Sequence, residues 1–472
     1  MGKIKYLGKN IALFSISNFV SKILVFLLVP FYTNVLSTYE YGIADVFQVT
    51  LLLLVPMITV NIGEAALRFG IEEIDNRKSI LVIGVRYVVR ASIIVAAVCV
   101  AGLLVFTGDE IRLYLLLFAV LFLTNAFYEF LILYYQGCES VETVVIGSVT
   151  CTITMIGCNL FFLLYMKSGL NGYLYSQMIA YTVASLVMFL CAGRGTAGEV
   201  FAEQKKDLEK RMLAYSHPMI VYSTASWVNN AVDRYFVLYM CGAAVNGVYG
   251  VAYKIPAILM VFQRIFAQAW QMSATKVHKD EDSDRFYSDM YKVYNSFMVL
   301  GCAALILFVK PVAAFLFRKD FYEAWKLVPP LLISVIFGAL TGFFGSICLA
   351  HKDSASMGKA TGIGALINVI LNLIMIPYYE AMGAAIATGI SYFVMGALAL
   401  VFVSKHVKIS ANFVRNIISY VLLVVQSFVM ISEPDYHYAV CAVVFILLLV
   451  LYIRDIAEII KVLISKIKKK GE

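Results

Sequence analysis

Charge is scarce in this chain. Asp, Glu, Lys and Arg make up only 14% of its 472 residues, whereas about 25% is usual for soluble domains. Nine cysteines are present, but no two of them form a CxxC pair, and none lies near histidines at a spacing that suits zinc. These features exclude a soluble enzyme, a disordered chain and a disulfide-stapled secreted module, and they give no reason to expect a metal.

Apolar residues dominate instead. They account for 61% of the chain, the mean hydropathy is +0.84, and runs of about 20 apolar residues recur, each long enough to cross a bilayer as a helix. We therefore predict an all-α polytopic membrane protein with fourteen transmembrane helices. The predicted spans cover residues 10–36, 44–70, 79–106, 112–137, 142–166, 170–193, 214–241, 246–274, 286–309, 321–350, 357–378, 383–403, 412–432 and 438–460.

The distribution of basic residues predicts how these spans are oriented in the membrane. Loops on the N-terminal side carry about five times as many Lys and Arg residues as the opposite loops, which predicts that both termini are cytoplasmic. The chain ends in a lysine cluster, Lys466, Lys468, Lys469 and Lys470, which should attract anionic membrane lipids by about 1 kcal/mol per charge. The net charge of +8 therefore indicates a membrane surface as the partner, and no nucleic acid.

Weak internal repetition divides the chain. Tyr41-Gly42-Ile43-Ala44 follows the first span much as Asn246-Gly247-Val248-Tyr249 follows the seventh, and Asn159 and Asn372 precede similar turns. Transporters are often built from such repeats, with the substrate bound between them. The expected order is an N-terminal lobe of helices one to six (1–193), a cytoplasmic linker forming a short surface helix (194–213), a C-terminal lobe of helices seven to twelve (214–403), and helices thirteen and fourteen with the basic tail (404–472).

Ionised residues inside the first three spans are candidates for function, because a charge at mid-membrane costs about 2.5–3.5 kcal/mol. Lys22 lies about 18 Å along the first span, where it either faces a cavity or pairs with a carboxylate such as Asp45 or Glu64. Arg86 and Arg90 share one face of the third span. They either hold an anion between them, snorkel to the headgroups or pair with Glu129 on the fourth span.

The second, seventh and eighth spans carry further charges. Arg68 follows Glu64 by four residues, so an intrahelical pair competes with a functional role. Asp233 and Arg234 point about 100° apart on a helix, so one can pair locally while the other faces a cavity. Lys254 precedes Pro256, a bend-forming residue.

Basic residues outnumber acidic ones within the spans, a balance that suits an anionic substrate, and Arg and Lys are the usual partners of phosphate. The predicted substrate contacts are Lys22, Arg68, Arg86, Arg90, Arg234, Lys254 and Arg264. The predicted gating or ion-pairing residues are Asp233, Glu64 and Glu129.

The sequence lacks the common catalytic, nucleotide-binding and metal-binding motifs. The sequence contains no P-loop, no nucleotide fingerprint, no nucleophile elbow and no metal motif. We therefore expect no enzymatic activity and no cofactor, and we expect transport to draw on an ion gradient or the membrane potential.

Several motifs together resemble a known family. They are Leu28-Val29-Pro30-Phe31-Tyr32-Thr33-Asn34-Val35-Leu36-Ser37 followed by Glu40-Tyr41-Gly42, then Arg68-Phe69, His217-Pro218, Trp227, Asp233-Arg234-Tyr235, Gly247-Val248-Tyr249, Ala252-Tyr253-Lys254-Ile255-Pro256, Ala324-Trp325, Pro329-Pro330-Leu331-Leu332, and Asn368, Asn372, Pro377 and Gly383-Ala384-Ala385. In this order they are similar to bacterial polysaccharide flippases, which export O-antigen or capsule repeat units. These proteins belong to the multidrug/oligosaccharidyl-lipid/polysaccharide exporter superfamily.

The resemblance implies two six-helix lobes in a V shape, like that of MATE transporters, around a cavity that opens alternately to each side. It implies movement of a polyprenyl-diphosphate-linked oligosaccharide across the bacterial cytoplasmic membrane, with polysaccharide polymerases and glycosyltransferases as protein partners. In a related peptidoglycan-precursor flippase, cations of the first and eighth spans serve the diphosphate, and Lys22 and Lys254 lie at similar places, as Lys where the relative has Arg. The segments 421–430 and 440–451 match the walls of its lipid-tail groove.

Three alternatives make different predictions. A multidrug or cation antiporter of the same fold should have buried acids in its first lobe, where bases dominate here. A membrane-embedded polymerase or ligase should have long external loops with catalytic residues, but no predicted outer loop is longer than about ten residues. A scaffold or scramblase-like protein should tolerate neutralisation of the central bases.

Overall fold

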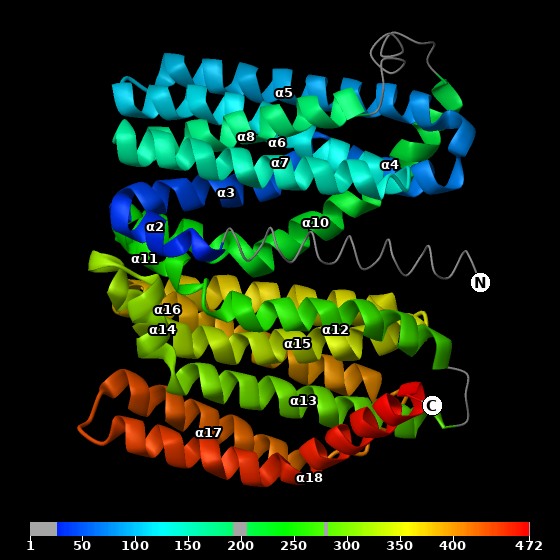
Figure 1. Cartoon of the computed structure of the whole chain (residues 1–472), viewed down its shortest axis with the longest axis vertical. Coiled ribbons are helices and arrows are strands. Elements are labelled where there is room, and N and C mark those ends of the chain that lie inside the picture. The colour runs from blue at the N-terminus through cyan, green and yellow to red at the C-terminus, as the bar shows by residue number, and fades with distance from the viewer. Residues whose placement is uncertain (1–25, 192–204, 278–281, 472) are drawn as a thin grey trace. The chain divides into compact units, whose positions relative to one another are not determined.

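The computed structural model describes residues 26–191, 205–277 and 282–471, and every regular element within these ranges is a helix (Figure 1). The chain divides into two compact units, unit 1 (residues 1–228) and unit 2 (residues 229–472). The boundary falls inside one long helix, α10 (Lys206–Cys241). Each unit is built on its own core.

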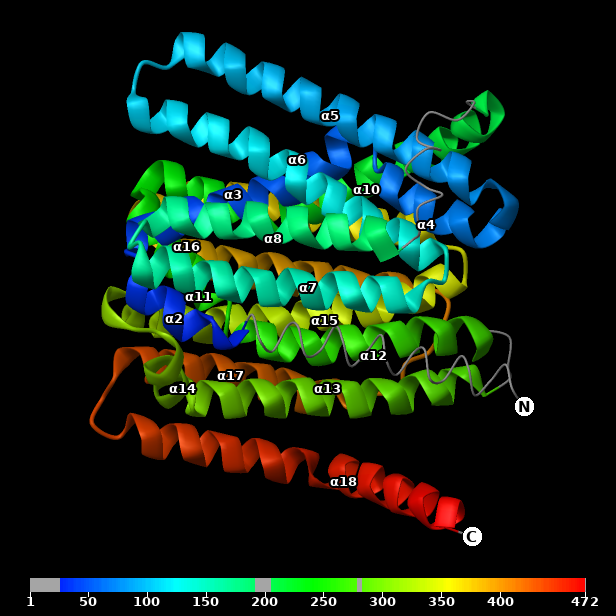
Figure 2. The same ribbon diagram turned by 45° about the horizontal axis from the view of Figure 1, so that its top comes forward.

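Unit 1 consists of long apolar helices joined by short turns (Figure 2). Besides the first part of α10, its described elements are α2 (Val29–Val35), α3 (Thr38–Ile58), α4 (Ile62–Glu72), η1 (Ile74–Asn76), α5 (Arg77–Val105), α6 (Asp109–Gly137), α7 (Val141–Asn159), η2 (Leu160–Tyr165) and α8 (Gly169–Cys191).

A capping box starts α3. The Ser37 hydroxyl accepts a hydrogen bond from the Glu40 N–H, and the Glu40 carboxylate accepts one from the Ser37 N–H at 2.8 Å. The same carboxylate also accepts the Leu170 N–H at 3.0 Å. These bonds satisfy backbone donors that a helix leaves unpaired at its N-terminus. Glu40 thus ties the start of α3 to the start of α8.

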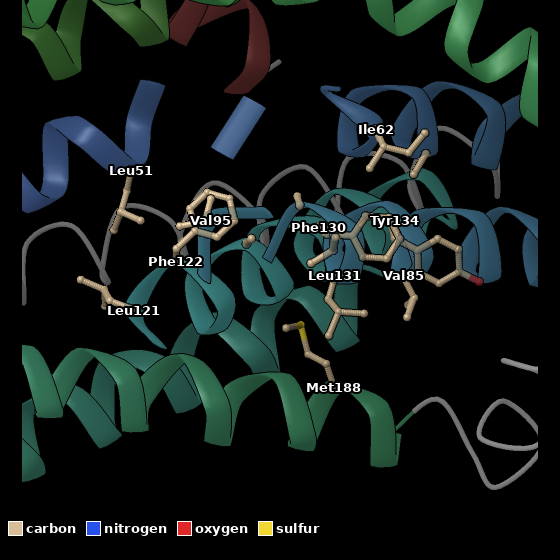
Figure 3. Packing of buried hydrophobic residues seen from close by; sticks show 14 of the residues in the cluster. Leu51, Ile62, Val85, Val95, Leu121, Phe122, Phe130, Leu131, Tyr134 and Met188 are labelled. Atoms are coloured by element: carbon tan, nitrogen blue, oxygen red, sulfur yellow. The ribbon is translucent and has the colours of Figure 1, made fainter. Parts of the chain in front are cut away.

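The core of unit 1 lies between α5 and α6, with α4 and α8 packed against it (Figure 3). Val88 and Phe122 are fully buried there. Gly84 lets α6 approach α5 closely, because a Cβ at this position would stand only 2.0 Å from Cε2 of Phe130. Small residues at a helix interface allow this kind of close packing in membranes.

Unit 2 contains the remaining helices. They are the last part of α10, α11 (Ala243–Ala252), α12 (Pro256–Val277), α13 (Ser283–Leu307), α14 (Val309–Leu316), η3 (Lys319–Leu327), α15 (Val328–Ala350), α16 (Ser354–Val403), α17 (Phe413–Ser432) and α18 (His437–Gly471). Most of α15 is buried, and aromatic stacking joins it to α12 and α13: the ring of Phe343 lies 4.3 Å from that of Trp270 and 5.8 Å from that of Tyr294. Helix α15 is therefore central to the core of unit 2.

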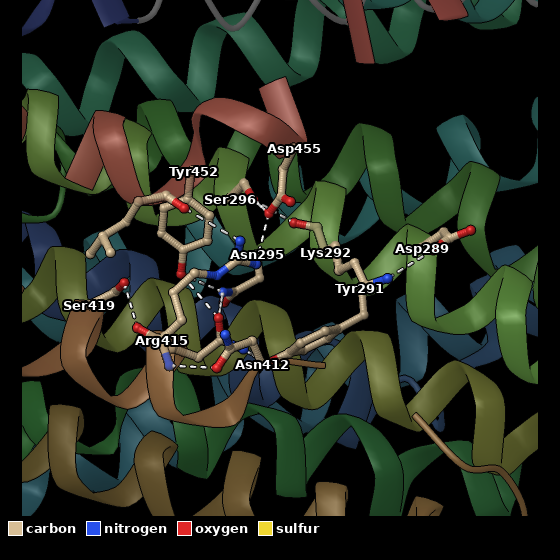
Figure 4. A network of polar contacts seen from close by, with 12 residues as sticks. Asp289, Tyr291, Lys292, Asn295, Ser296, Asn412, Arg415, Ser419, Tyr452 and Asp455 are labelled. Carbon is tan, nitrogen blue, oxygen red and sulfur yellow. Dashed lines mark hydrogen bonds and ion pairs between the residues drawn. The ribbon is translucent and has the colours of Figure 1, made fainter. Parts of the chain in front are cut away.

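Polar contacts attach α17 and α18 to α13 (Figure 4). The fully buried Asn295 of α13 donates to the Tyr452 hydroxyl at 3.1 Å and to the Asn416 side chain at 3.2 Å. Arg415 of α17 pairs with Asp455 of α18 at 2.8 Å, and Asp455 also accepts a hydrogen bond from Ser296. Buried side chains that hydrogen-bond across helices hold membrane bundles together.

The all-α polytopic architecture predicted from the sequence is confirmed. The described residues contain ten helices long and apolar enough to cross a membrane, or eleven with the bent pair α11–α12. Within this set α16 combines two helices, which meet at the left-handed Glu380 (φ 48°). Helix α10 is not among the ten, and the first predicted span lies mostly outside the described residues. The count of fourteen and the lobe boundaries stay predictions.

Candidate functional site

Helices α11 and α12 are together long and apolar enough to cross a membrane, and they are separated by a sharp break. The two helices are bent by 50° across Tyr253, Lys254 and Ile255, and Pro256 begins α12. Proline lacks an N–H and disfavours helical backbone before it, so the break has a local cause. Irregular backbone at membrane depth is tolerated only where it is buried in protein or lines a water-filled space.

Lys254 lies in this break. Its backbone N–H donates to the Val251 carbonyl at 2.9 Å, which ends α11 in a tight turn, and its side chain is half-buried. Among the described residues, the Lys254 ammonium has no hydrogen-bond or ion-pair partner. A half-buried cation with no carboxylate beside it is costly in a membrane protein and is poised to bind an anion.

Arg234 lies close to this lysine. Its guanidinium carbon lies 4.8 Å from the centre of the Tyr253 ring, so Arg234 of α10 packs on the residue that precedes Lys254. Planar guanidinium groups stack well on aromatic rings, and their fork of N–H groups matches the geometry of phosphate. The structure therefore places Arg234 in contact with the residue next to Lys254, another of the predicted substrate contacts.

Asp233 takes a different role from its neighbour. Its buried carboxylate oxygen Oδ2 accepts hydrogen bonds from the hydroxyls of Tyr249, Tyr253 (2.9 Å) and Thr388 (3.4 Å), while Oδ1 accepts the Arg234 N–H at 2.9 Å. A buried carboxylate needs this number of donors to offset its lost hydration. Asp233 thereby links α10, α11 and α16.

The tyrosine partners of Asp233 were not predicted from the sequence. Tyr249 and Tyr253 are four residues apart and lie on one face of the same element, a spacing that could have indicated a shared partner. The network continues into α16, where Asn372 donates to Asn368 at 3.0 Å and Asn368 donates to Thr388 at 3.5 Å.

In unit 1, Arg68 and Glu64 do not form the intrahelical pair considered from the sequence. Arg68 is exposed, pairs with Glu72 at 3.2 Å and lies over the Tyr215 ring at 4.8 Å. Glu64 is half-buried near the start of α4. Both acids are four residues from Arg68, so spacing alone cannot distinguish them.

Arg86 and Arg90 lie on either side of a contact between α5 and α10. Tyr87 donates to Glu209 at 3.0 Å, and Arg90 packs over the Tyr87 ring at 5.5 Å. Neither arginine pairs with Glu129 among the described residues, and Glu129 is exposed on α6. The polar first turns of α10 therefore reach α5 between the two arginines.

A cavity of about 390 Å³ adjoins this contact. The residues that line it, all on α10, are Lys206, Glu209, Lys210, Leu213, Ala214 and His217. Lys206 and Lys210 lie in the predicted linker, and neither was predicted as a site residue. Residues 206–213 form the first two turns of α10.

The remaining predicted residues are placed as follows. Arg264 is exposed on α12 and has no hydrogen-bond or ion-pair partner among the described residues. Lys22 lies outside the described residues. In the described part of the chain, no group of three His, Cys, Asp or Glu side chains is arranged to hold a metal ion.

Unit 1 contains neutral polar contacts at membrane depth. Gln48 of α3 donates to Gln177 of α8 at 2.5 Å, and Asn159 of α7 donates to the Tyr32 hydroxyl at 2.9 Å. These contacts join the helices of unit 1 without an ionised group.

Comparison with known proteins shows which family the chain belongs to. Residues 7–271, more than half of the sequence, match the model of the family described as polysaccharide biosynthesis protein. A curated relative, the probable low-salt glycan biosynthesis flippase Agl15 of Haloferax volcanii, is 22% identical over 53% of this chain and 53% of its own length. The chain spans less than two thirds of the length of the first curated relatives that it matches.

Two solved structures share the fold. The lipid II flippase MurJ in an inward-closed conformation superposes with a TM-score of 0.67 at 18% identity, covering 96% of this chain and 100% of MurJ. An inward-facing MATE family transporter of the MOP superfamily gives a TM-score of 0.67 at 14% identity, covering 82% and 96%. The family match and the shared fold confirm the recognition made from the motifs: the chain belongs to the polysaccharide biosynthesis protein family of multi-pass membrane proteins.

Proposed function

We propose that the protein is a flippase that moves polyprenyl-diphosphate-linked oligosaccharide repeat units across the bacterial cytoplasmic membrane for cell-surface polysaccharide biosynthesis. The observation that carries the proposal is the half-buried ammonium of Lys254 in the break between α11 and α12, with Arg234 stacked on the adjacent Tyr253. The names of two similar proteins, a probable glycan biosynthesis flippase and a lipid II flippase, support the same class of cargo.

The chemistry fits a diphosphate. The ammonium of Lys254 can donate to phosphate oxygens as a compact point charge, while the guanidinium of Arg234 can donate through two parallel N–H groups. Charge-assisted hydrogen bonds of this kind contribute about 1.5–3 kcal/mol each. The lipid tail stays in the bilayer, so the protein must satisfy only the charged and sugar parts of the cargo.

We further propose that Asp233 couples transport to an ion gradient. Its carboxylate is held by three hydroxyl donors from two helices other than its own. Uptake of a proton or cation at Asp233 would weaken or reorganise these bonds and so change how α10, α11 and α16 hold together. Glu64 and Glu129 remain proposed gating residues of unit 1.

The test is a flipping assay in proteoliposomes that contain a fluorescent polyprenyl-diphosphate disaccharide. We expect Lys254→Ala to lower the flipping rate about ten- to hundred-fold, the equivalent of one charge-assisted contact. Lys254→Arg should keep most of the activity because the charge remains. Lys405→Ala, at a lysine that packs on Phe402 after α16, is the matched control and should flip at the wild-type rate.

The alternative is a multidrug or cation antiporter of the same fold. The buried carboxylate of Asp233 is the feature that favours it, because an acid could attract a cationic drug. Ethidium efflux from the same vesicles decides between the two. Efflux that depends on Asp233, together with no effect of Lys254→Ala on lipid flipping, would overturn the flippase proposal.

A further inference from the structure

A second cavity lies in unit 2, and no residue of the broken pair α11–α12 lines it. Its volume is about 550 Å³, and it is formed where α13 ends, α14 and η3 follow, and α18 begins. Leu307, Phe308, Pro311 and Ala314 supply apolar walls, and Lys310 contributes an ammonium to the lining. Tyr322 and Tyr438 add aromatic rings. Pockets that are mostly apolar with a few fixed polar groups are typical of small-molecule sites.

Lys310 is held in a defined position. Its ammonium pairs with Glu433 at the end of α17, lies 3.4 Å from Nε2 of His437, and lies 4.8 Å from the centre of the Trp325 ring. The side chain is only 15% exposed. An ammonium has three N–H donors, so Lys310 can bind a ligand oxygen and keep Glu433 as a partner. Neighbouring side chains therefore fix the position of the Lys310 ammonium, unlike that of a mobile surface lysine.

The charges around the cavity are balanced. The Lys310 ammonium lowers the pKa of the Glu433 carboxyl from its usual value, so Glu433 is ionised at neutral pH. Lys326, the next cation, is itself paired with Glu323 at 2.6 Å. A site with one cation beside one anion complements a headgroup that carries both charges, and it offers no net attraction to an anionic headgroup.

The position of the cavity in the fold suits a bound lipid. The cavity lies at the ends of α13 and α18 that are predicted to face away from the cytoplasm, and the neighbouring rings of Phe308 and Phe315 are 55% and 58% exposed. Exposed aromatic residues at helix ends are typical of the membrane interface. An acyl chain can therefore lie along the apolar walls while its headgroup reaches Lys310 and Glu433.

We propose that this cavity is a binding site for a zwitterionic phospholipid, with phosphatidylethanolamine as the preferred headgroup. The phosphate would accept hydrogen bonds from Lys310, and the primary amine would donate to the Glu433 carboxylate, whose side chain is 44% exposed. Phosphatidylcholine offers the same charges but no N–H donor. The site does not depend on the proposed transport function, because it uses none of the residues of the broken helix.

The experiment measures lipid retention by native mass spectrometry of the full chain, released from bilayers that contain equal amounts of phosphatidylethanolamine, phosphatidylcholine and phosphatidylglycerol. The wild type should retain phosphatidylethanolamine several-fold over the other two. Lys310→Gln should lose this preference. Glu433→Gln leaves the cation without its partner and should shift retention towards phosphatidylglycerol. Lys167→Gln, at an outer-side lysine of unit 1, is the matched control and should behave as the wild type.

The two cavity variants predict opposite changes, so a general loss of folding cannot imitate the expected result. Thermal unfolding of each purified variant is recorded alongside. Equal retention of the three lipids by the wild type, a wild-type preference for phosphatidylglycerol, or a Glu433→Gln variant with unchanged selectivity would each overturn the proposal.

Discussion

Two neutral contacts of unit 1 and one ionised group of unit 2 show different ways of holding helices together at membrane depth. In unit 1 the contacts of Gln48 with Gln177 and of Asn159 with Tyr32 join helices through neutral groups alone. In unit 2 a buried carboxylate, Asp233, is surrounded by hydroxyls of Tyr249, Tyr253 and Thr388. A neutral amide pair would hold helices together at a lower desolvation cost than an ionised group. The charge in unit 2 therefore exceeds what packing requires, which points to a role in the transport cycle.

The largest expected effect is at Asp233. Asp233→Ala removes the common acceptor of the Tyr249 and Tyr253 hydroxyls, and each buried donor left without a partner costs about 1–3 kcal/mol. Asp233→Asn keeps an acceptor oxygen and should cost less. Thermal unfolding of the purified variants in detergent gives both values. If Asp233→Ala is as stable as the wild type, the carboxylate does not hold α10, α11 and α16 together.

Glycine substitutions compare the packing of the two units. A Cβ at Gly84 would meet the rigid ring of Phe130 at 2.0 Å, whereas a Cβ at Gly364 would meet Cγ of the flexible Met395 at 2.0 Å. Overpacking usually costs about 1–3 kcal/mol, and methionine can adopt another rotamer. We expect Gly84→Ala to lower the unfolding temperature clearly more than Gly364→Ala. Equal losses would show that Met395 is as confined as Phe130.

A smaller effect is expected for the neutral contact of unit 1. Hydrogen bonds between membrane helices contribute about 0.6 kcal/mol on average, so Gln48→Ala should destabilise unit 1 only slightly. A double-mutant cycle with Gln177→Ala isolates the coupling between the two side chains. If the coupling free energy between Gln48 and Gln177 is as large as the stability lost in Asp233→Ala, the neutral contact is as important as the ionised one and this difference between the units disappears.

Acid should weaken one ion pair at an end of each unit, with the smallest overall effect. Arg211 and then Asn76 lower the pKa of Glu73 in unit 1, and Lys310 lowers that of Glu433 in unit 2, both from an ordinary value of 4.5. A carboxyl with a depressed folded-state pKa stabilises the fold above its ordinary pKa, and the contribution is lost as the pH falls through the folded value.

The stability difference between wild type and Glu433→Gln should therefore be present near neutral pH and be lost as the pH falls from 4.5 through the lowered pKa of Glu433. Glu73→Gln gives the parallel measurement for unit 1. A difference that persists in acid would mean that the glutamine changes packing and that the loss is not electrostatic. Unfolding temperatures recorded over this pH range provide the data.

Much of the fold could be predicted from the sequence, because long apolar runs and Lys/Arg bias are local signals. The break at Lys254 could also be expected, since Lys254 interrupts an apolar run two residues before Pro256. The partners of Asp233 could not, because they depend on which helices meet. The environment of Arg86 and Arg90 was missed for a related reason, because the first turns of α10 reach α5 at Tyr87, between the two arginines.

The polar attachment of α17 and α18 has a consequence for shorter versions of this architecture. If the chain ended after α16, Asn295 and Ser296 of α13 would lose partners on α17 and α18 and would face hydrocarbon. A relative without the terminal hairpin must therefore carry apolar residues at these two positions, and a truncated form of this chain would need the same replacements to remain stable. The hairpin and one face of α13 therefore depend on each other for stability and act as a single structural unit.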